Sequence, residues 1–351
     1  MTAPVHRDVL LRLGARRSPL ARAQVDLVAG ALAELGVHTT FTGVTTRGDV
    51  DRRELTEIGG TGVFATAVRD ALFSDTIDLA VHSLKDLPTA EVPQLRVVAV
   101  PRREDTRDVL IGKRLADLDH GDRVGTGAPR RAVQLQDWAQ RNGLRIDVVA
   151  IRGNVDTRIE LVRSGVVDAV LLAAAGLQRL GHLPPPEPDR TDTVVKTLPS
   201  EFLVHSVMLP APGQGALALE IHGRLGAELQ AIVARLDDPV ARAECQVERA
   251  FLATLEAGCT APVGARATVA SGRDNGPDLT LTAVIGRTLL SNLSEPANRA
   301  PILRWEATGT GDPAEFGSAE ARRVLIELAK QSSGHPSSPV ADRTKERERS
   351  Q

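Results

Sequence analysis

The sequence predicts an α/β protein with largely parallel sheets, followed by a smaller α+β unit. Three observations favour this class. Over the first two-thirds of the chain, short apolar runs alternate with longer helix-like segments, and these runs end in glycine-rich or polar turns. Near Gly223 this alternation stops. The chain has 351 residues, of which 42% are hydrophobic and 25% charged, as expected for a globular protein of two or three domains.

Each expected element follows from its local pattern. Residues 9–13 form an apolar strand, and 18–35 form a helix because Ser18 can cap it and Pro19 suits its first turn. Further strands are expected at 40–45, 77–81, 96–100, 108–111, 146–150 and 167–172, and further helices at 63–73, 130–141, 155–164 and 174–181. After Gly223 we expect two long helices, then strands at 264–269, 279–285 and 302–307, and a helix near 314–330.

Composition narrows the classes of partner. The net charge of −2 gives no reason to expect a nucleic-acid partner. The start of the chain, MTAPVHRDVLLRLG, is too charged for a signal peptide, and the longest apolar stretch, 166–177, is interrupted by Asp168 and too short to span a bilayer. We therefore expect a cytoplasmic protein with no membrane partner. Residues 332–351 have little apolar content and are expected to be a disordered tail.

The stretch DLAVHSLKDLPT, residues 78–89, places polar side chains where a buried strand is expected to end. A base, a hydroxyl, an ammonium and a carboxylate follow one another there as His82, Ser83, Lys85 and Asp86. Only five of the 43 basic residues are lysines, so Lys85 is unusual, whereas an arginine alone says little. The stretch therefore indicates a functional site at the end of a strand.

Three turns combine a strand end, a helix start and arginines: GARRSPLARAQ (14–24), GTGAPRRAVQL (125–135) and IRGNVDTRIELV (151–162). Basic side chains in the first turn of a helix oppose the helix dipole, so they cost stability unless an anion binds there. Any single turn could hold merely solvated arginines. Three of them would line one crevice at the carboxyl ends of the strands, which favours a polyanionic ligand.

The two cysteines do not form a disulfide framework. Cys245 lies inside a helix that is expected to begin at Pro239, with Gly258 as its C-cap, and Cys259 follows on a loop. At ~1.5 Å per helical residue the two sulfurs are ~21 Å apart, too far to pair. Cys245 is expected to be inert. Cys259 is either an ordinary thiol or a nucleophile and attachment point.

Taken in order, these stretches closely resemble the porphobilinogen deaminase, or hydroxymethylbilane synthase, family. The resemblance covers residues 10 to about 266 almost continuously. It runs through LRLGARRSPLARAQ, TTRGD, GGTGVF, DLAVHSLKDLPT, REDTRDVL, VGTGAPRRAVQL, IRGNVDTRIELV, DAVLLAAAGLQRLG, LPAPGQGALALE and VERAFLATLEAGCTAPVG.

The resemblance implies two periplasmic-binding-protein type II-like domains with a cleft between them, plus a small α+β C-terminal domain. Domain 1 would comprise 1–103 with 200–222 on the catalytic side, and domain 2, 104–199, would bind carboxylates. Domain 3, 223–331, would carry the cofactor cysteine. The implied enzyme is a monomeric transferase of porphyrin and heme biosynthesis. It would condense four porphobilinogens with loss of ammonia onto a dipyrromethane cofactor, thioether-linked to Cys259, and release hydroxymethylbilane with water.

The family's functional residues carry over to matching positions. Asp86 matches the family's catalytic aspartate. One carboxylate there can hydrogen-bond pyrrole N–H groups and stabilise the cationic azafulvene that ammonia loss leaves. The implied cofactor-binding residues, besides Cys259, are Lys85, Ser83, Arg130, Arg131 and Thr126. The implied substrate-binding residues are Arg16, Ser18, Arg152, Arg158, Arg179 and Phe64. No metal is implied. Each pyrrole carries an acetate and a propionate, and arginine binds carboxylates through two parallel hydrogen bonds.

The chain departs from the family pattern at several positions. Lysines of some members are replaced by Glu57, Thr61 and Thr66, hydroxyl residues by Gly127 and Ala128, and a common threonine by Ala15; segment 184–207 is longer than usual. Two alternatives remain open: a weakly active paralogue that keeps the cofactor, and an anion-binding module of the same fold. The presence of Asp86 and Cys259 argues against the module, since an anion receptor gains nothing from a carboxylate among arginines.

Overall fold

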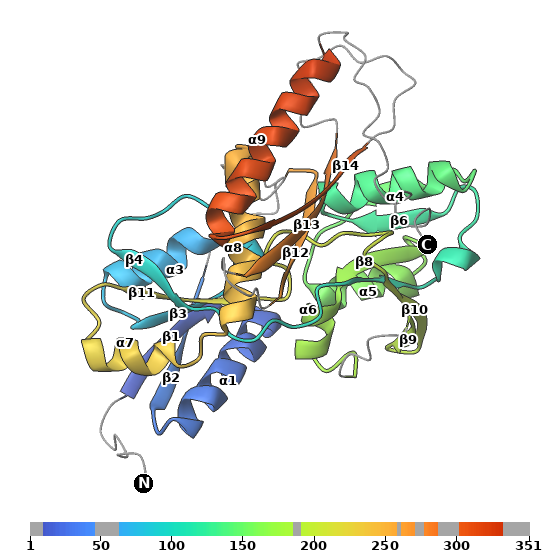
Figure 1. The fold of residues 1–351 in the computed structure, drawn as a ribbon. Coiled ribbons are helices and arrows are strands. Elements are labelled where there is room, and N and C mark those ends of the chain that lie inside the picture. Colours follow the sequence, from blue (N-terminus) through green and yellow to red (C-terminus); the bar gives the residue numbers. More distant parts are fainter. Residues whose placement is uncertain are drawn as a thin grey trace, which may run out of the picture.

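The computed structural model describes residues 10–45, 63–184, 191–257, 261–270, 277–286 and 302–332. Within these ranges the chain forms three sheets, each with its own helices (Figure 1). The first two sheets lie side by side in the view, and the third unit lies above them. Cys259, Glu57, Thr61 and the expected tail fall outside the described ranges.

The first sheet has five strands in the order β2-β1-β3-β11-β4. Their bounds are β1 Leu10–Arg16, β2 His38–Val44, β3 Leu79–Ser83, β4 Leu95–Ala99 and β11 Leu217–His222. β1 runs parallel to β2 and β3, whereas β11 is antiparallel to β3 and β4. Helices α1 (Pro19–Glu34) and α7 (Ala227–Ala234) pack on one face. Helix α3 (Val63–Phe73) packs on the other.

The second sheet has six strands in the order β7-β6-β8-β5-β10-β9. Their bounds are β5 Asp108–Ile111, β6 Arg123–Thr126, β7 Asp147–Ala150, β8 Ala169–Ala173, β9 Asp192–Val195 and β10 Leu198–Leu203. Helices α5 (Val155–Arg163) and α6 (Ala174–Arg179) pack on one face. Helix α4 (Pro129–Arg141) packs on the other. Both sheets therefore lie buried between helices.

The third unit is an antiparallel sheet of β12 (Val263–Ala270), β13 (Asp278–Gly286) and β14 (Ile302–Thr310). It shares a core with helices α8 (Pro239–Thr254) and α9 (Pro313–Ser332). Asp238 caps α8, its carboxylate accepting from the Ala241 N–H at 2.8 Å. The helix ends at Thr254 with Leu255 as its C-cap, so the expected cap at Gly258 is wrong.

The α/β class and the small α+β unit are confirmed, but the expectation of largely parallel sheets is wrong. Both sheets are mixed: β11 is antiparallel to β3 and β4, and β5 is antiparallel to β8 and β10. The sequence analysis did not recognise β9, β10 and β11. The pattern of β11, LALEIH, has a glutamate at its centre, and Glu220 is nevertheless buried.

Two segments of the chain cross between the first two sheets, 100–107 and 204–216, and they run side by side. The Glu104 N–H donates to the Gly215 carbonyl at 3.3 Å, and Gln214 Nε2 donates to the Thr106 carbonyl at 2.8 Å. Gly215 has a φ of +88°, and a Cβ there would lie 2.5 Å from the Glu104 oxygen. Only glycine allows so close an approach.

These pairings bear on the expected domain boundaries. Strand β10 lies wholly in the six-stranded sheet, whereas the expected first unit includes its residues 200–203. We therefore propose that the second unit runs from 104 to 203 and that the chain then returns to the first.

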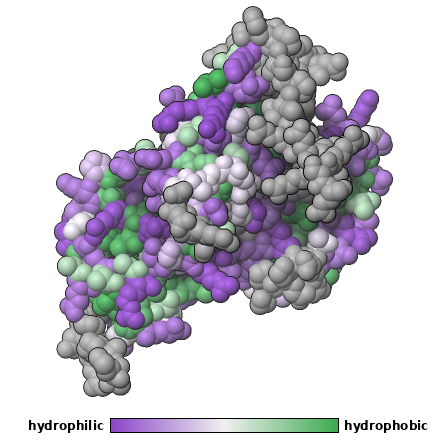
Figure 2. All heavy atoms as spheres, in the orientation of Figure 1, coloured by the Kyte–Doolittle hydropathy of each residue, from purple (hydrophilic) through white to green (hydrophobic). Residues whose placement is uncertain are grey.

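Hydrophilic residues predominate on the face of the molecule that Figure 2 shows. Within the part of the chain that the structure describes, no helix is long and apolar enough to cross a membrane.

Candidate active site

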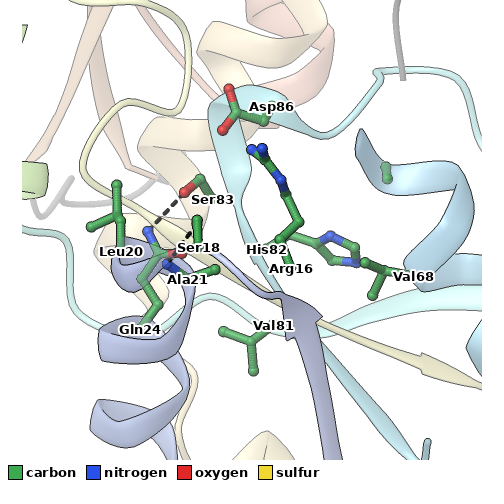
Figure 3. A pocket seen from close by; sticks show the side chains of 11 residues that line it. Arg16, Ser18, Leu20, Ala21, Gln24, Val68, Val81, His82, Ser83 and Asp86 are labelled. Carbon is green, nitrogen blue, oxygen red and sulfur yellow. Dashed lines mark hydrogen bonds between the residues drawn. The ribbon is translucent and has the colours of Figure 1, made fainter. Parts of the chain in front are cut away.

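A small pocket of about 70 Å³ lies where β1 and β3 end and α1 begins (Figure 3). Its lining includes Arg16, Ser18, Gln24, Ser83 and Asp86. Ser18 is the N-cap of α1, as expected, and its Oγ accepts from the Ala21 N–H at 3.3 Å. Because β1 and β3 are parallel neighbours, their ends place residues from both stretches around one site.

The stretch after β3 presents the expected catalytic group. Ser83 Oγ accepts a hydrogen bond from Gln24 Nε2 at 2.7 Å, and a single 3₁₀ turn, Leu84–Asp86, follows with Leu84 buried. Asp86 is exposed, and among the residues that the structure describes no hydrogen bond or ion pair holds its carboxylate. That carboxylate is therefore available to a ligand.

Lys85 reaches toward the second sheet. Its Nζ donates to Gln214 Oε1 at 3.3 Å, and Arg130 Nη2 donates to the same oxygen at 3.4 Å. The pKa of Lys85 is lowered to about 8, chiefly by burial. The charges of Arg131 and Arg130 act in the same direction, and the charge of Asp86 acts against them. A ligand carboxylate beside the ammonium would stabilise its charged form.

Arg130 and Arg131 lie deeper than the turn pattern suggests. Their exposed fractions are 4% and 5%, and Asp108 accepts from Arg130 Nη1 at 2.6 Å and from Arg131 Nη2 at 2.8 Å. Burial alone would raise the pKa of Asp108, but the two guanidiniums hold it well below its usual range. The protein's own carboxylate thus already pairs both arginines, and the sequence analysis missed this role of Asp108.

A partner for these arginines could have been suspected from the sequence. Asp108 opens a strand whose other residues are apolar, and a buried carboxylate requires cationic partners. Gln214, fully buried, was also missed: its Nε2 donates to Asp108 Oδ1 at 2.9 Å, so it links Lys85 and Arg130 to Asp108. Thr126 is buried too, and its Oγ1 accepts from the Ala128 N–H at 3.2 Å.

The turn after β7 places two arginines nearer to solvent. Asn154 caps α5, and Arg158 Nε donates to the Gly153 carbonyl at 2.9 Å, while Arg152 is exposed. Burial lowers the pKa of Arg158 to about 10, as do the charges of Arg131 and Arg152, whereas Asp86 raises it. Asp86 of the first unit therefore lies within electrostatic reach of Arg158 in the second.

Arg179, at the end of α6, contributes a further, half-buried cation. Its Nη2 donates to the Gly215 carbonyl at 2.7 Å, and its Nε is buried without a hydrogen-bond partner among the described residues. Burial lowers its pKa, against the charge of Glu104. Gly127 lies so close to the Ile151 carbonyl that a Cβ would stand 2.7 Å from its oxygen.

Some expected site residues are placed only in part. Phe64 falls in α3, but its side chain lies outside what the structure describes, and Cys259 lies between the described residues Ala257 and Ala261. Cys245 is 2% exposed in α8, and burial raises its pKa to about 12, so this thiol is inert as expected. No cluster of three or more potential metal ligands occurs in the described ranges.

Fold and site together define an α/β protein that gathers cations from two sheets around one exposed carboxylate, as suits an enzyme acting on a carboxylate-rich ligand. A family model described as "Porphobilinogen deaminase, dipyromethane cofactor binding domain" matches residues 11–226, and one for the C-terminal domain of the same proteins matches 242–294. The chain belongs to the porphobilinogen deaminase family.

Curated relatives agree with the family models. The chain is 49% identical over 296 residues to porphobilinogen deaminase 1 of Streptomyces coelicolor, covering 83% of this chain and 88% of that one. It is also 49% identical over 339 residues to the porphobilinogen deaminase of Leifsonia xyli, covering 92% of each. The predicted family membership is therefore confirmed.

Solved structures show only distant likeness. A ligand-binding component of an ABC-type import system from Staphylococcus aureus superposes with a TM-score of 0.37 at 10% identity, covering 70% of this chain and 73% of that one. A periplasmic substrate-binding protein from Coxiella burnetii gives 0.36 at 16% identity, covering 65% and 92%. Scores this low carry no argument about function.

Proposed function

We propose that this chain makes hydroxymethylbilane from porphobilinogen, with Asp86 at the reacting centre and the surrounding cations binding the pyrrole carboxylates. As a porphobilinogen deaminase, it is a transferase of porphyrin and heme biosynthesis with a dipyrromethane cofactor. The two alternatives, a weakly active paralogue and an anion-binding module, would each give a different result in the turnover test below.

The residues present fit a dipyrromethane with its carboxylates. Among the residues that the structure describes, Arg131 and Arg179 each keep a buried Nε without a hydrogen-bond partner. Lys85 is half-buried, desolvation lowers its pKa, and its hydrogen bond to Gln214 is long, so its ammonium can bind a carboxylate. Cations that are incompletely satisfied by the protein are what an anionic cofactor requires.

When bound, the cofactor supplies the primer pyrrole to which substrate units are added. We assign its carboxylates to Lys85, Ser83, Arg130, Arg131 and Thr126, and its thioether to Cys259. The carboxylates of incoming porphobilinogen are assigned to Arg16, Ser18, Arg152, Arg158 and Arg179, beside Phe64. These assignments rest on the family motif together with the convergence of the described members.

In this proposal Asp86 is the group that stabilises positive charge on the substrate. Its carboxylate accepts a hydrogen bond from the substrate pyrrole N–H, and it stabilises the positive charge that develops as ammonia leaves. Neighbouring cations hold the substrate carboxylates away from it. One observation carries the proposal: Asp86 is exposed, has no hydrogen-bond or ion-pair partner among the described residues, and lies within electrostatic reach of Lys85 and Arg158.

We further propose that the enzyme works in the cytoplasm as a monomer, using water to release its product. Membership of a family of biosynthetic enzymes supports the first point, and the hydrophobic cores that the sheets form with the chain's own helices support the monomer. Light scattering during gel filtration would test the monomer.

The direct test of the proposed function is turnover. Purified protein from a host that makes porphobilinogen should consume this substrate with release of ammonia and yield hydroxymethylbilane. Elongation of the bound chain without release would instead identify the weakly active paralogue. Porphobilinogen binding with neither ammonia nor adduct would favour the anion-binding module.

Cofactor loading should depend on pH through Lys85. Its ammonium is charged below a pKa of about 8 and neutral above it, so carboxylate binding should weaken as pH rises through this value. Above pH 8, unloaded wild-type protein given porphobilinogen should acquire its adduct more slowly than the Lys85→Arg variant does. The ratio of the wild-type rate to the variant rate should fall by up to about tenfold per pH unit above 8. The ratio, followed by intact mass from pH 7 to 9.5, cancels the effect of pH on the cysteine.

A ratio that stays level over this range would show that Lys85 does not bind a cofactor carboxylate.

A further inference from the structure

The pocket contains a histidine to which the mechanism above gives no role. His82 lies on β3, four residues before Asp86, and lines the same pocket as Arg16 and Ser18. Figure 3 shows its ring next to Val68, across the pocket from Gln24. A pocket histidine beside a catalytic carboxylate is a candidate for contact with the substrate.

Next to the pocket, His82 belongs to a network of hydrogen-bonded side chains with Glu220 and Arg69. His82 Nε2 lies 3.2 Å from Glu220 Oε2, and Arg69 donates to the same carboxylate from Nε at 3.0 Å and from Nη2 at 2.8 Å. In the β3–β11 pairing Ala218 faces His82 and Glu220 faces Ala80, so the imidazole and the carboxylate share one face. This network of side chains thus joins β3, β11 and α3.

These contacts determine which ring nitrogen carries the hydrogen. Burial alone would raise the pKa of Glu220, but the hydrogen bonds from His82 and Arg69 lower it below its usual value. An ionised carboxylate only accepts, so Nε2 must be the donor, and Nδ1 of a neutral ring is then an acceptor.

Nδ1 has no hydrogen-bond donor among the residues that the structure describes, and the ring lines a pocket whose other polar residues include Arg16, Ser18 and Ser83. We infer that Nδ1 of His82 accepts a hydrogen bond from an N–H donor of porphobilinogen, and that Glu220 and Arg69 are positioning residues that hold Nε2 of the ring against the carboxylate and so leave Nδ1 to the ligand. The inference rests on the proposed function, because porphobilinogen is the pocket's ligand in it. The donor is either the pyrrole N–H or the aminomethyl ammonium.

Three variants separate this role from simple packing. His82→Phe keeps a flat ring but has no acceptor, and His82→Gln keeps an acceptor oxygen. Glu220→Gln, whose side chain does not line the pocket, can donate to Nε2 and so move the ring hydrogen to Nδ1. We expect KM for porphobilinogen to rise about tenfold in His82→Phe and in Glu220→Gln, as for one lost hydrogen bond, with kcat changed by less than about threefold. His82→Gln should retain most of the affinity.

Nitrogen-15 NMR of the wild-type holoenzyme gives a second measurement that does not depend on how the variants fold. It should show hydrogen on Nε2 and none on Nδ1 of His82, and the reverse in Glu220→Gln. A porphobilinogen analogue with methyl in place of the aminomethyl group identifies the donor. Weaker analogue binding in His82→Phe points to the pyrrole N–H, and unchanged analogue binding points to the ammonium; either agrees with the inference.

An unchanged KM in His82→Phe, or a wild-type ring with hydrogen on Nδ1, would overturn the inference while leaving the proposed function intact. Failure of the proposed function itself looks different, because the wild-type holoenzyme would then form no hydroxymethylbilane at all.

Discussion

Replacing Cys259 by serine should abolish the covalent cofactor and reduce hydroxymethylbilane formation at least about a hundredfold. A thioether forms when a thiolate captures an electrophilic carbon, and a serine hydroxyl is not ionised near neutral pH. Intact mass should show wild-type protein heavier than its sequence by one dipyrromethane, and the Cys259→Ser protein at its sequence mass. An aldehyde reagent for pyrroles should stain only the former.

Cys245→Ser is the matched control for the thiol chemistry. Because burial raises the pKa of Cys245 to about 12, this sulfur stays protonated and should not carry the adduct. The control variant should keep the full adduct, although a hydroxyl in this core position should lower its melting temperature. An adduct that persisted in Cys259→Ser and vanished in Cys245→Ser would reverse the assignment.

Asp86→Asn should keep the fold and the bound cofactor but lower kcat by roughly two orders of magnitude or more, as for loss of a charge-stabilising group. The carboxylate makes no hydrogen bond with the described part of the protein and is exposed, so the melting temperature should stay nearly unchanged. Steady-state kinetics with intact mass of the same sample would separate loss of turnover from loss of cofactor.

Asp26→Asn serves as the charge-matched control. Asp26 lies on α1, is exposed and pairs with Arg22, so its replacement removes one negative charge without touching the pocket. Its kcat should equal that of the wild type. Turnover in Asp86→Asn comparable with that of this control would remove Asp86 from the reacting centre.

Much of the fold could be predicted because local signals agree with it. Ser18 and Pro19 mark the start of α1, and the structure places the helix there with the expected cap. The strand expected at 77–81 is present as β3, which extends past its apolar run to include His82 and Ser83. The family motifs identified the chemistry because they are ordered along the chain.

The missed strand and the missed buried ion pairs share one cause: residues distant in sequence decide which side chains are buried and paired. Strand β11 has Glu220 at its centre, a pattern that local reasoning does not read as a buried strand. Arg69 and His82 make that burial possible, and they lie 151 and 138 residues earlier in the chain. No local pattern links these three positions.

For this protein, the sequence by itself determined most of the helices and strands, the family and the identity of the reactive groups. Each of these depends on residues close together in the chain or on motifs in a set order. The tertiary structure decided which groups are already paired. It buries Arg130 and Arg131 on Asp108, and it leaves Asp86 without a partner among the described residues. The physical reason is that a charge entering a low-dielectric interior requires a counter-charge, and only the folded chain brings that counter-charge near.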